Sequence, residues 1–96
     1  MHIFSGYNYE HHPKACVNGA NIVLYPKMTL EQCKIRCDER IDCEAFEYGV
    51  GYGGKGRYKP EDCNLQSSAD LSGCDGVHHN LDLYVKKGMC RNFLVV

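Results

Sequence analysis

Short segments with strand-like patterns recur along the chain. Apolar and polar residues alternate in 44–48 (EAFEY) and strictly in 81–86 (LDLYVK), as in a strand with one buried face. Segment 21–25 (NIVLY) is rich in β-branched and aromatic residues and stops at Pro26, and segment 63–67 (CNLQS) has a similar character. The pattern therefore predicts four strands, with 81–86 in the core of the sheet.

One helix is predicted between the strands at 21–25 and 44–48. Thr29 followed by Gln32 three residues later forms a capping box, in which each side chain bonds the backbone N–H of the other residue. The helix is expected over residues 30–40. The spacing places three residues on its inner face: Leu30, Cys33 and Cys37.

The remaining segments have the character of loops and ends. Segment 49–59 (GVGYGGKGRYK) holds five glycines and predicts a flexible connection between strands. A second long loop is expected over 68–80, and it contains Cys74. Residues 1–15 show neither helical nor strand periodicity and are interpreted as a flexible leader or linker. Residues 91–96 (RNFLVV) are interpreted as an apolar C-terminal tail.

Composition adds covalent cross-links to this picture. The chain has 96 residues, of which seven are cysteine and none is tryptophan. A core of this size is marginal, and small cysteine-rich domains are usually held by disulfides in an oxidising compartment. We therefore expect a secreted or surface-displayed domain. The first residues have no signal-peptide character, so the sequence is expected to be one unit of a longer secreted protein.

The charge pattern excludes some partners. Eleven Lys and Arg against twelve Asp and Glu leave a net charge of -1, without the basic excess that nucleic-acid binding needs. No apolar run is long enough to cross a bilayer. We expect no nucleic-acid partner and no direct membrane insertion.

Helix geometry restricts the pairing of the seven cysteines without fixing it. Cys33 and Cys37 are four residues apart on one helix, too far from each other for a disulfide. Cys43 can fold back onto Cys37, and Cys63 lies on a strand that could pass beneath Cys33. The first and last cysteines bracket the domain.

The pattern over residues 16–90 resembles the PAN/apple domain. The spacing Cys33-x3-Cys37-x5-Cys43-x2-Phe46-x-Tyr48 is followed by Cys63-x-Leu65 and by a Leu83-Tyr84 strand that ends near Cys90. The resemblance implies an α+β fold in which one helix packs across an antiparallel sheet of about five strands.

The same resemblance implies a disulfide framework. Its three bonds are Cys16–Cys90, Cys33–Cys63 and Cys37–Cys43. Cys74 has no place among them, so the alternatives are a free thiol, an intermolecular disulfide, or a bond within the chain that displaces a framework pair.

A zinc site is not expected. Cys33 and Cys37 have a loosely suitable spacing, but no second pair of ligands answers them. The histidines occur as adjacent pairs, whose rings tend to diverge: His11 with His12, and His78 with His79.

Catalysis is not expected either, and we predict no cofactor. Cys74 with His78 or His79 is the candidate nucleophile and base. Asp75 next to that thiol would raise its pKa and weaken it as a nucleophile. No nucleophile elbow, phosphate loop or paired-carboxylate signature occurs elsewhere.

A ligand-binding surface is the favoured hypothesis for function. Tyr52, Lys55, Arg57 and Tyr58 alternate aromatic rings with cationic groups in the glycine-rich loop. Such sets suit sugar rings and also occur at protein hot spots.

The sequence thus predicts an extracellular recognition module. Its expected ligand is a protein receptor or a glycan, either on a host cell or elsewhere outside the cell. The module would be one unit of a tandem array used in cell attachment, as in the micronemal adhesins that parasites release from a secretory organelle. Neighbouring modules of the same chain are expected partners. The alternatives are a stand-alone lectin and an apple domain that assembles protease or other subunits.

Overall fold

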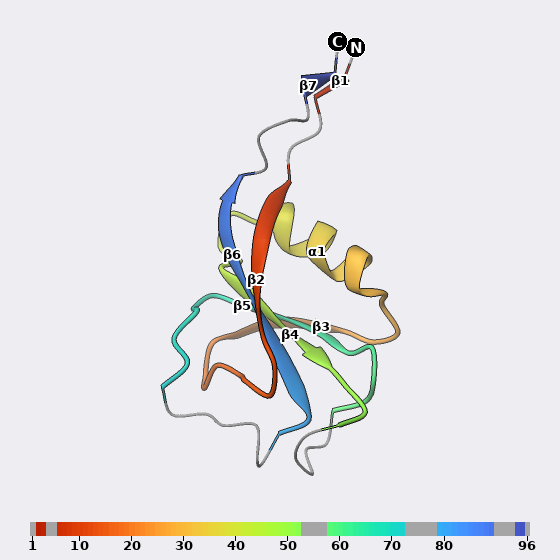
Figure 1. The fold of residues 1–96 in the computed structure, drawn as a ribbon, viewed down its shortest axis with the longest axis vertical. Coiled ribbons are helices and arrows are strands. Elements are labelled where there is room, and N and C mark those ends of the chain that lie inside the picture. Colours follow the sequence, from red (N-terminus) through yellow and green to blue (C-terminus); the bar gives the residue numbers. More distant parts are fainter. Residues whose placement is uncertain (1, 4–5, 53–57, 73–78, 90–93, 96) are drawn as a thin grey trace.

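A five-stranded antiparallel sheet with one helix across it forms the body of the protein in the computed structural model (Figure 1). The structure describes residues 2–3, 6–52, 58–72, 79–89 and 94–95. The strand order in the sheet is β2-β6-β4-β5-β3. Its elements are β2 (Tyr7–His12), β3 (Asn21–Tyr25), α1 (Leu30–Asp38), β4 (Ala45–Gly49), β5 (Cys63–Gln66) and β6 (Leu81–Met89). The predicted α+β architecture is confirmed.

Helix α1 begins at the predicted capping box. The Gln32 N–H donates to Thr29 Oγ1 at 3.1 Å, and the Thr29 N–H donates to Gln32 Oε1 at 2.9 Å. The helix ends at Asp38, two residues before the predicted end. There the Arg40 N–H bonds the Cys37 carbonyl at 3.2 Å, a tighter i to i−3 turn that closes the helix. With nine residues in α1, no helix in the described part of the chain is long and apolar enough to cross a membrane.

Two disulfides tie α1 to the sheet. Cys33 bonds Cys63 on β5, and Cys37 bonds Cys43 just before β4. These are two of the pairs that the family resemblance implies. All four cysteines are buried in one core cluster with Phe46 and Leu65, between the helix and the sheet.

The opposite side of the sheet, here called the back face, has a smaller core. Val17, Ala45 and Leu83 form its buried cluster, and Ala15 and Ala69 pack against them. Segments 13–20 and 67–72 therefore cover the back face.

A buried carboxylate lies beside that cluster. Glu47 is 2% exposed. It accepts hydrogen bonds from the Val17 N–H at 2.8 Å, Asn64 Nδ2 at 3.0 Å and Gln66 Nε2 at 3.1 Å. Burial raises the pKa of Glu47, and the bonds from Val17 and Asn64 oppose that rise only in part.

The N-terminal segment differs from its interpretation as a leader. Residues 7–12 form the edge strand β2, which pairs with β6 from Tyr7 opposite Met89 to His12 opposite Leu83. The rings of Tyr9 and His11 join an aromatic row on the helix side of the sheet, where His11 stacks on Tyr84 and Tyr9 is tilted to Phe46. Aromatic residues two positions apart are a strand pattern, and strand pairing orders a segment that would otherwise fray.

The two ends of the chain lie side by side. β1 (His2–Ile3) pairs with β7 (Leu94–Val95) in a separate two-stranded ladder. Figure 1 shows this ladder projecting from one pole of the sheet. Part of the segment interpreted as a tail is therefore a strand.

Cys16 is also disulfide-bonded, and it is 1% exposed. Its implied partner Cys90 and the unassigned Cys74 lie outside the described residues. The pair Cys16–Cys90 thus stays a prediction at this point.

Candidate ligand-binding site

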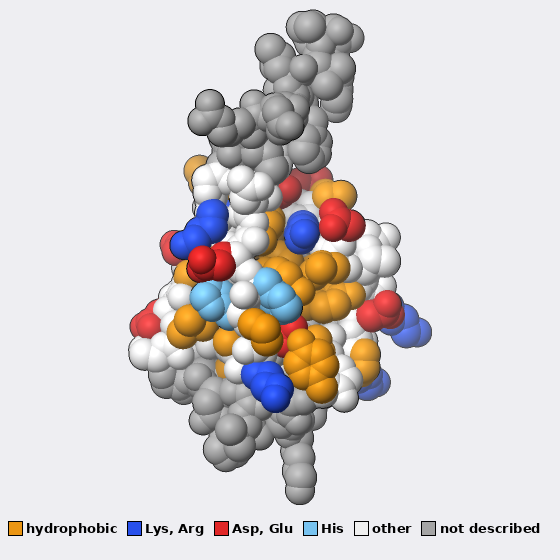
Figure 2. Space-filling view, in the orientation of Figure 1, with side chains coloured by type: hydrophobic (Ala, Val, Ile, Leu, Met, Phe, Trp, Pro, Cys, Tyr) orange, Lys and Arg blue, Asp and Glu red, His pale blue; other side chains and the backbone are white. Residues whose placement is uncertain are grey.

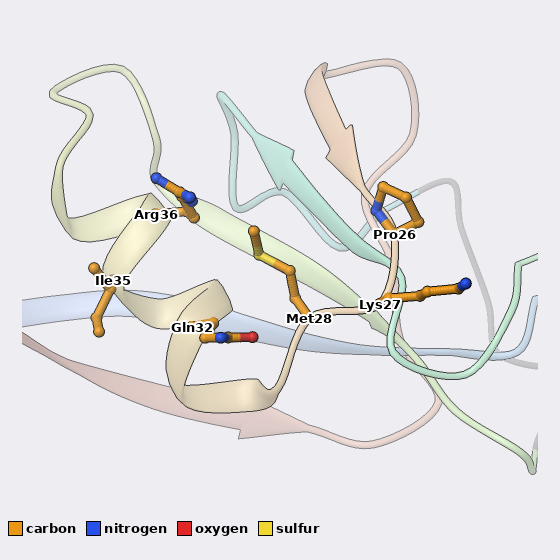
Figure 3. Close-up of a pocket in the computed structure, with 6 residues that line it drawn as sticks. All are labelled: Pro26, Lys27, Met28, Gln32, Ile35 and Arg36. Atoms are coloured by element: carbon orange, nitrogen blue, oxygen red, sulfur yellow. The ribbon is translucent and has the colours of Figure 1, made fainter.

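A hollow of about 360 Å³ lies between α1 and the segment that leads into it (Figure 3). We call it the α1 hollow. Its lining residues are Pro26, Lys27, Met28, Gln32, Ile35 and Arg36. In Figure 3 the Met28 side chain lies between the link from β3 and the helix, so the hollow has an apolar floor.

The link that forms this floor is held from the sheet side. The Met28 N–H donates to the Glu61 carbonyl at 3.0 Å, and Tyr48 Oη donates to the Met28 carbonyl at 2.6 Å. Lys27 adopts a left-handed backbone conformation with φ of 57°, which is uncommon for a residue with a side chain. The bend at Lys27 is therefore followed directly by a residue whose backbone N–H and carbonyl are both bonded to other segments.

The lining of the α1 hollow is cationic as well as apolar. Lys27 and Arg36 contribute two positive charges, and none of the six lining residues is acidic. The Arg36 guanidinium lies 5.4 Å from the centre of the Tyr25 ring, a cation–π distance. Its ion pair with Glu39 is 3.8 Å long and exposed, so it is weak and leaves Arg36 able to meet an anion.

Ile35 extends this apolar surface around the helix. Its side chain is 49% exposed, although it is large and aliphatic. Ile35 also lines a second hollow of about 480 Å³ between α1 and the start of β2. There Tyr9 Oη donates to Asp38 Oδ1 at 2.6 Å. Burial, followed by this bond, raises the pKa of Tyr9.

The loop set predicted from the sequence is only partly described. Lys55 and Arg57 lie outside the described residues. Tyr52 is 48% exposed and donates its hydroxyl to Asp82. Tyr58 is half-buried, and its carbonyl accepts from Asn80 Nδ2 at 2.6 Å. The structure thus ties both tyrosines to the start of β6 and its preceding loop.

Asp82 gathers three segments around one carboxylate. It is 2% exposed and accepts from Tyr52, from the Lys14 N–H at 3.0 Å, and from His11 Nε2 at 2.6 Å. Burial alone would raise the pKa of Asp82, but the bonds from Tyr52, Lys14 and His11 together outweigh it and lower the pKa. The bond to Asp82 raises the pKa of Tyr52 to about 12.

Aromatic rings continue from this carboxylate across the sheet. His11 stacks on Tyr84 at 4.5 Å between ring centres, and Tyr84 stacks on Phe46 at 5.0 Å. Tyr9 lies at a tilt to Phe46 at 5.2 Å. Figure 2 shows histidine side chains near the centre of this face, next to hydrophobic ones.

The residues considered for a zinc site or for a nucleophilic cysteine are not grouped in the part of the chain that the structure describes. His11 pairs with Asp82 and His12 with Glu10, so the two rings diverge as expected. Cys33 and Cys37 are in disulfides. Within the described ranges, no three His, Cys, Asp or Glu residues are grouped to hold a metal ion. The proposed nucleophile Cys74 and the base His78 lie outside those ranges, and His79 is half-buried.

The α1 hollow itself was not predicted from the sequence. Its residues come from the link and from one side of the helix, and they show no motif. Ile35 is the signal that was available, because it occupies an outer position of a helix whose inner face is defined by Cys33 and Cys37. An aliphatic residue at such a position is a candidate contact residue.

Compared with known proteins, the chain matches no protein-family model, no curated protein and no solved structure.

Proposed function

We propose that this protein is an extracellular recognition module that binds a protein ligand through the α1 hollow. The observation that supports the proposal is the hollow itself, which combines an apolar floor with two cations and a fixed backbone. Pre-organised apolar sites with a few charged groups are typical of binding surfaces.

The lining indicates the chemistry of the ligand. Met28 and Ile35 suit an apolar side chain, and Lys27 and Arg36 suit a carboxylate next to it. We therefore expect the ligand to be an extracellular protein that presents Asp or Glu beside Leu, Phe or Trp.

The wider setting belongs to the same proposal. Two disulfides in a small domain are consistent with an extracellular location. The cysteine spacing supports a PAN/apple module, and such a module would serve in cell attachment as one unit of an array. Affinity would then come mainly from several linked copies, and the module would bind without catalysing a reaction.

A glycan ligand is the second candidate, supported by Tyr52. Its ring is half-exposed while its hydroxyl is held by Asp82, so a flat ring is presented in a fixed position. Sugar rings stack on such surfaces, and the protein would then be a lectin.

The test is an array of short peptides that carry an acidic residue beside Leu, Phe or Trp. A matched array replaces each acid by its amide. We expect the protein to bind the acidic array, more strongly as linked copies, and to lose binding on the amide array. Binding should shift the methyl resonances of Met28 and Ile35.

Ile35→Glu should weaken this binding at least about tenfold, because it places a charge on the apolar contact. Ile41→Glu is the matched control, since Ile41 is 103% exposed and does not line the hollow. Equal binding by the two variants would contradict the proposal. Binding to a glycan array that Tyr52→Ala abolishes and Ile35→Glu leaves intact would favour the lectin instead.

A further inference from the structure

Cys16 is buried at 1% exposure and disulfide-bonded. Four of the other six cysteines are bonded to one another, as Cys33–Cys63 and Cys37–Cys43. Within the chain, the partner of Cys16 is therefore Cys74 or Cys90. We infer that it is Cys74, and that this bond joins the two segments that cover the back face. The inference is independent of the proposed ligand.

The two ends of β6 separate Cys16 from Cys90. The Ala15 N–H bonds the Leu81 carbonyl at 3.1 Å, so Cys16 lies near the first residue of β6. Cys90 directly follows Met89, the last residue of this nine-residue strand. Eight steps of a strand span about 27 Å.

This separation is too large for a disulfide. Cys90 lies one residue, or about 3.8 Å, beyond Met89. Even if the steps from Leu81 through Ala15 to Cys16 and from Met89 to Cys90 all pointed toward each other, the Cα atoms of Cys16 and Cys90 would stay more than about 10 Å apart. A disulfide needs about 4.4–6.8 Å between them.

Described residues on both sides of Cys74 in the sequence, in contrast, lie next to the neighbours of Cys16. Five residues before it, Ala69 packs against the cluster that contains Val17. Seven residues after it, Leu81 bonds Ala15. Since Ala15 and Val17 are the sequence neighbours of Cys16, Cys74 is within easy reach of the bond.

Another contact brings the same two segments together. The Ser67 N–H donates to the Ala20 carbonyl at 2.9 Å. A bond from Cys16 to Cys74 would fix the segment whose Val17 N–H donates to the buried Glu47. It would replace the Cys16–Cys90 pair that the family resemblance implies and make Cys90, not Cys74, the seventh cysteine.

Disulfide mapping of the intact protein tests the inference directly. Thiols are alkylated in denaturant without a reductant, and the chain is cut with trypsin and Asp-N. Cleavage at Lys and Arg and before Asp places the three cysteines on separate peptides, residues 15–27, 70–74 and 88–91. We expect 15–27 to be linked to 70–74. A link between 15–27 and 88–91 would overturn the inference.

Two single variants separate this bond from a general loss of stability. Cys74→Ser should expose Cys16 to alkylation and lower the Tm by roughly 10 °C or more, because a loop of that length is no longer closed. Cys90→Ser should leave Cys16 unreactive and the Tm nearly unchanged. The reverse result for the two variants would show that Cys16 pairs with Cys90.

Discussion

Asp82 connects three parts of the chain that lie 30 to 71 residues from it in the sequence. Its carboxylate accepts from β2 through His11, from the following loop through Lys14, and from the glycine-rich loop through Tyr52. A buried carboxylate with donors removed would carry a large desolvation cost. The three segments are therefore held together by one side chain.

Tyr52→Phe should lower the free energy of unfolding by about 1 kcal/mol at pH 7. The expected loss of stability is small because the ring is half-exposed and water can replace the lost donor. The folded pKa of Asp82 lies below its ordinary value of 3.8, so its contribution is present above that pH and is lost as the pH falls through the folded pKa. The difference between the two proteins should therefore shrink in acid, which urea unfolding at several pH values will measure.

An Asp82→Asn background provides the control for this prediction. There Tyr52→Phe no longer removes a bond to a charged group, so its effect should be much smaller. An equal effect in both backgrounds would mean that Tyr52 stabilises the protein by some other contact.

Glu47 responds to pH in the opposite direction. Burial raises its folded pKa above the ordinary value of 4.5, so the charged form costs stability at neutral pH. That cost is relieved as the pH falls through the folded pKa toward 4.5. Relative to Glu47→Gln, which does not titrate, the unmodified protein should gain stability between neutral pH and pH 4.5. Urea unfolding of both proteins gives the comparison, and a constant difference would contradict the pKa shift.

Among the elements, α1 and the link before it form both the capped start of the helix and the lining of the α1 hollow. The capping box fixes where the helix begins, and the link holds Met28 against the helix. Loss of the cap would therefore loosen the edge of the α1 hollow as well as the helix.

Thr29→Ala should cost about 1 kcal/mol of stability, because the Gln32 N–H loses its acceptor. Thr29→Ser keeps that acceptor and should be nearly neutral. Urea unfolding of the two variants measures the difference. Equal destabilisation by Ala and Ser would show that the methyl group, rather than the cap, is what matters.

The elements were predictable where local signals and burial agree. Segment 21–25 became β3 with the same bounds, and the capping box marked the start of α1. The edge strand β2 was missed, because its contacts with β6, Phe46 and Asp38 are all long-range, and the local sequence does not reveal them. The α1 hollow was missed for a similar reason, since a bend at Lys27 brings its two sides together.

At the scale of the whole molecule, the two faces of one sheet are covered by different elements, which are held by different contacts. Cys33–Cys63 and Cys37–Cys43 secure α1 on one face, whereas Glu47 and the Val17 cluster hold the covering segments on the other. The cysteine spacing was enough to predict the first arrangement through a family resemblance. The position of Cys16 was not predictable, because it depends on how far β2 extends along β6.

The pairing of β1 with β7 makes the protein suited to circular permutation. Since His2 lies opposite Val95, a short glycine-rich linker would span the two ends without strain. New ends could open between Asn18 and Gly19, both of which are exposed. In that rearranged chain β6 would run through the ladder directly into β2, so two strands that now meet from opposite ends of the sequence would become consecutive.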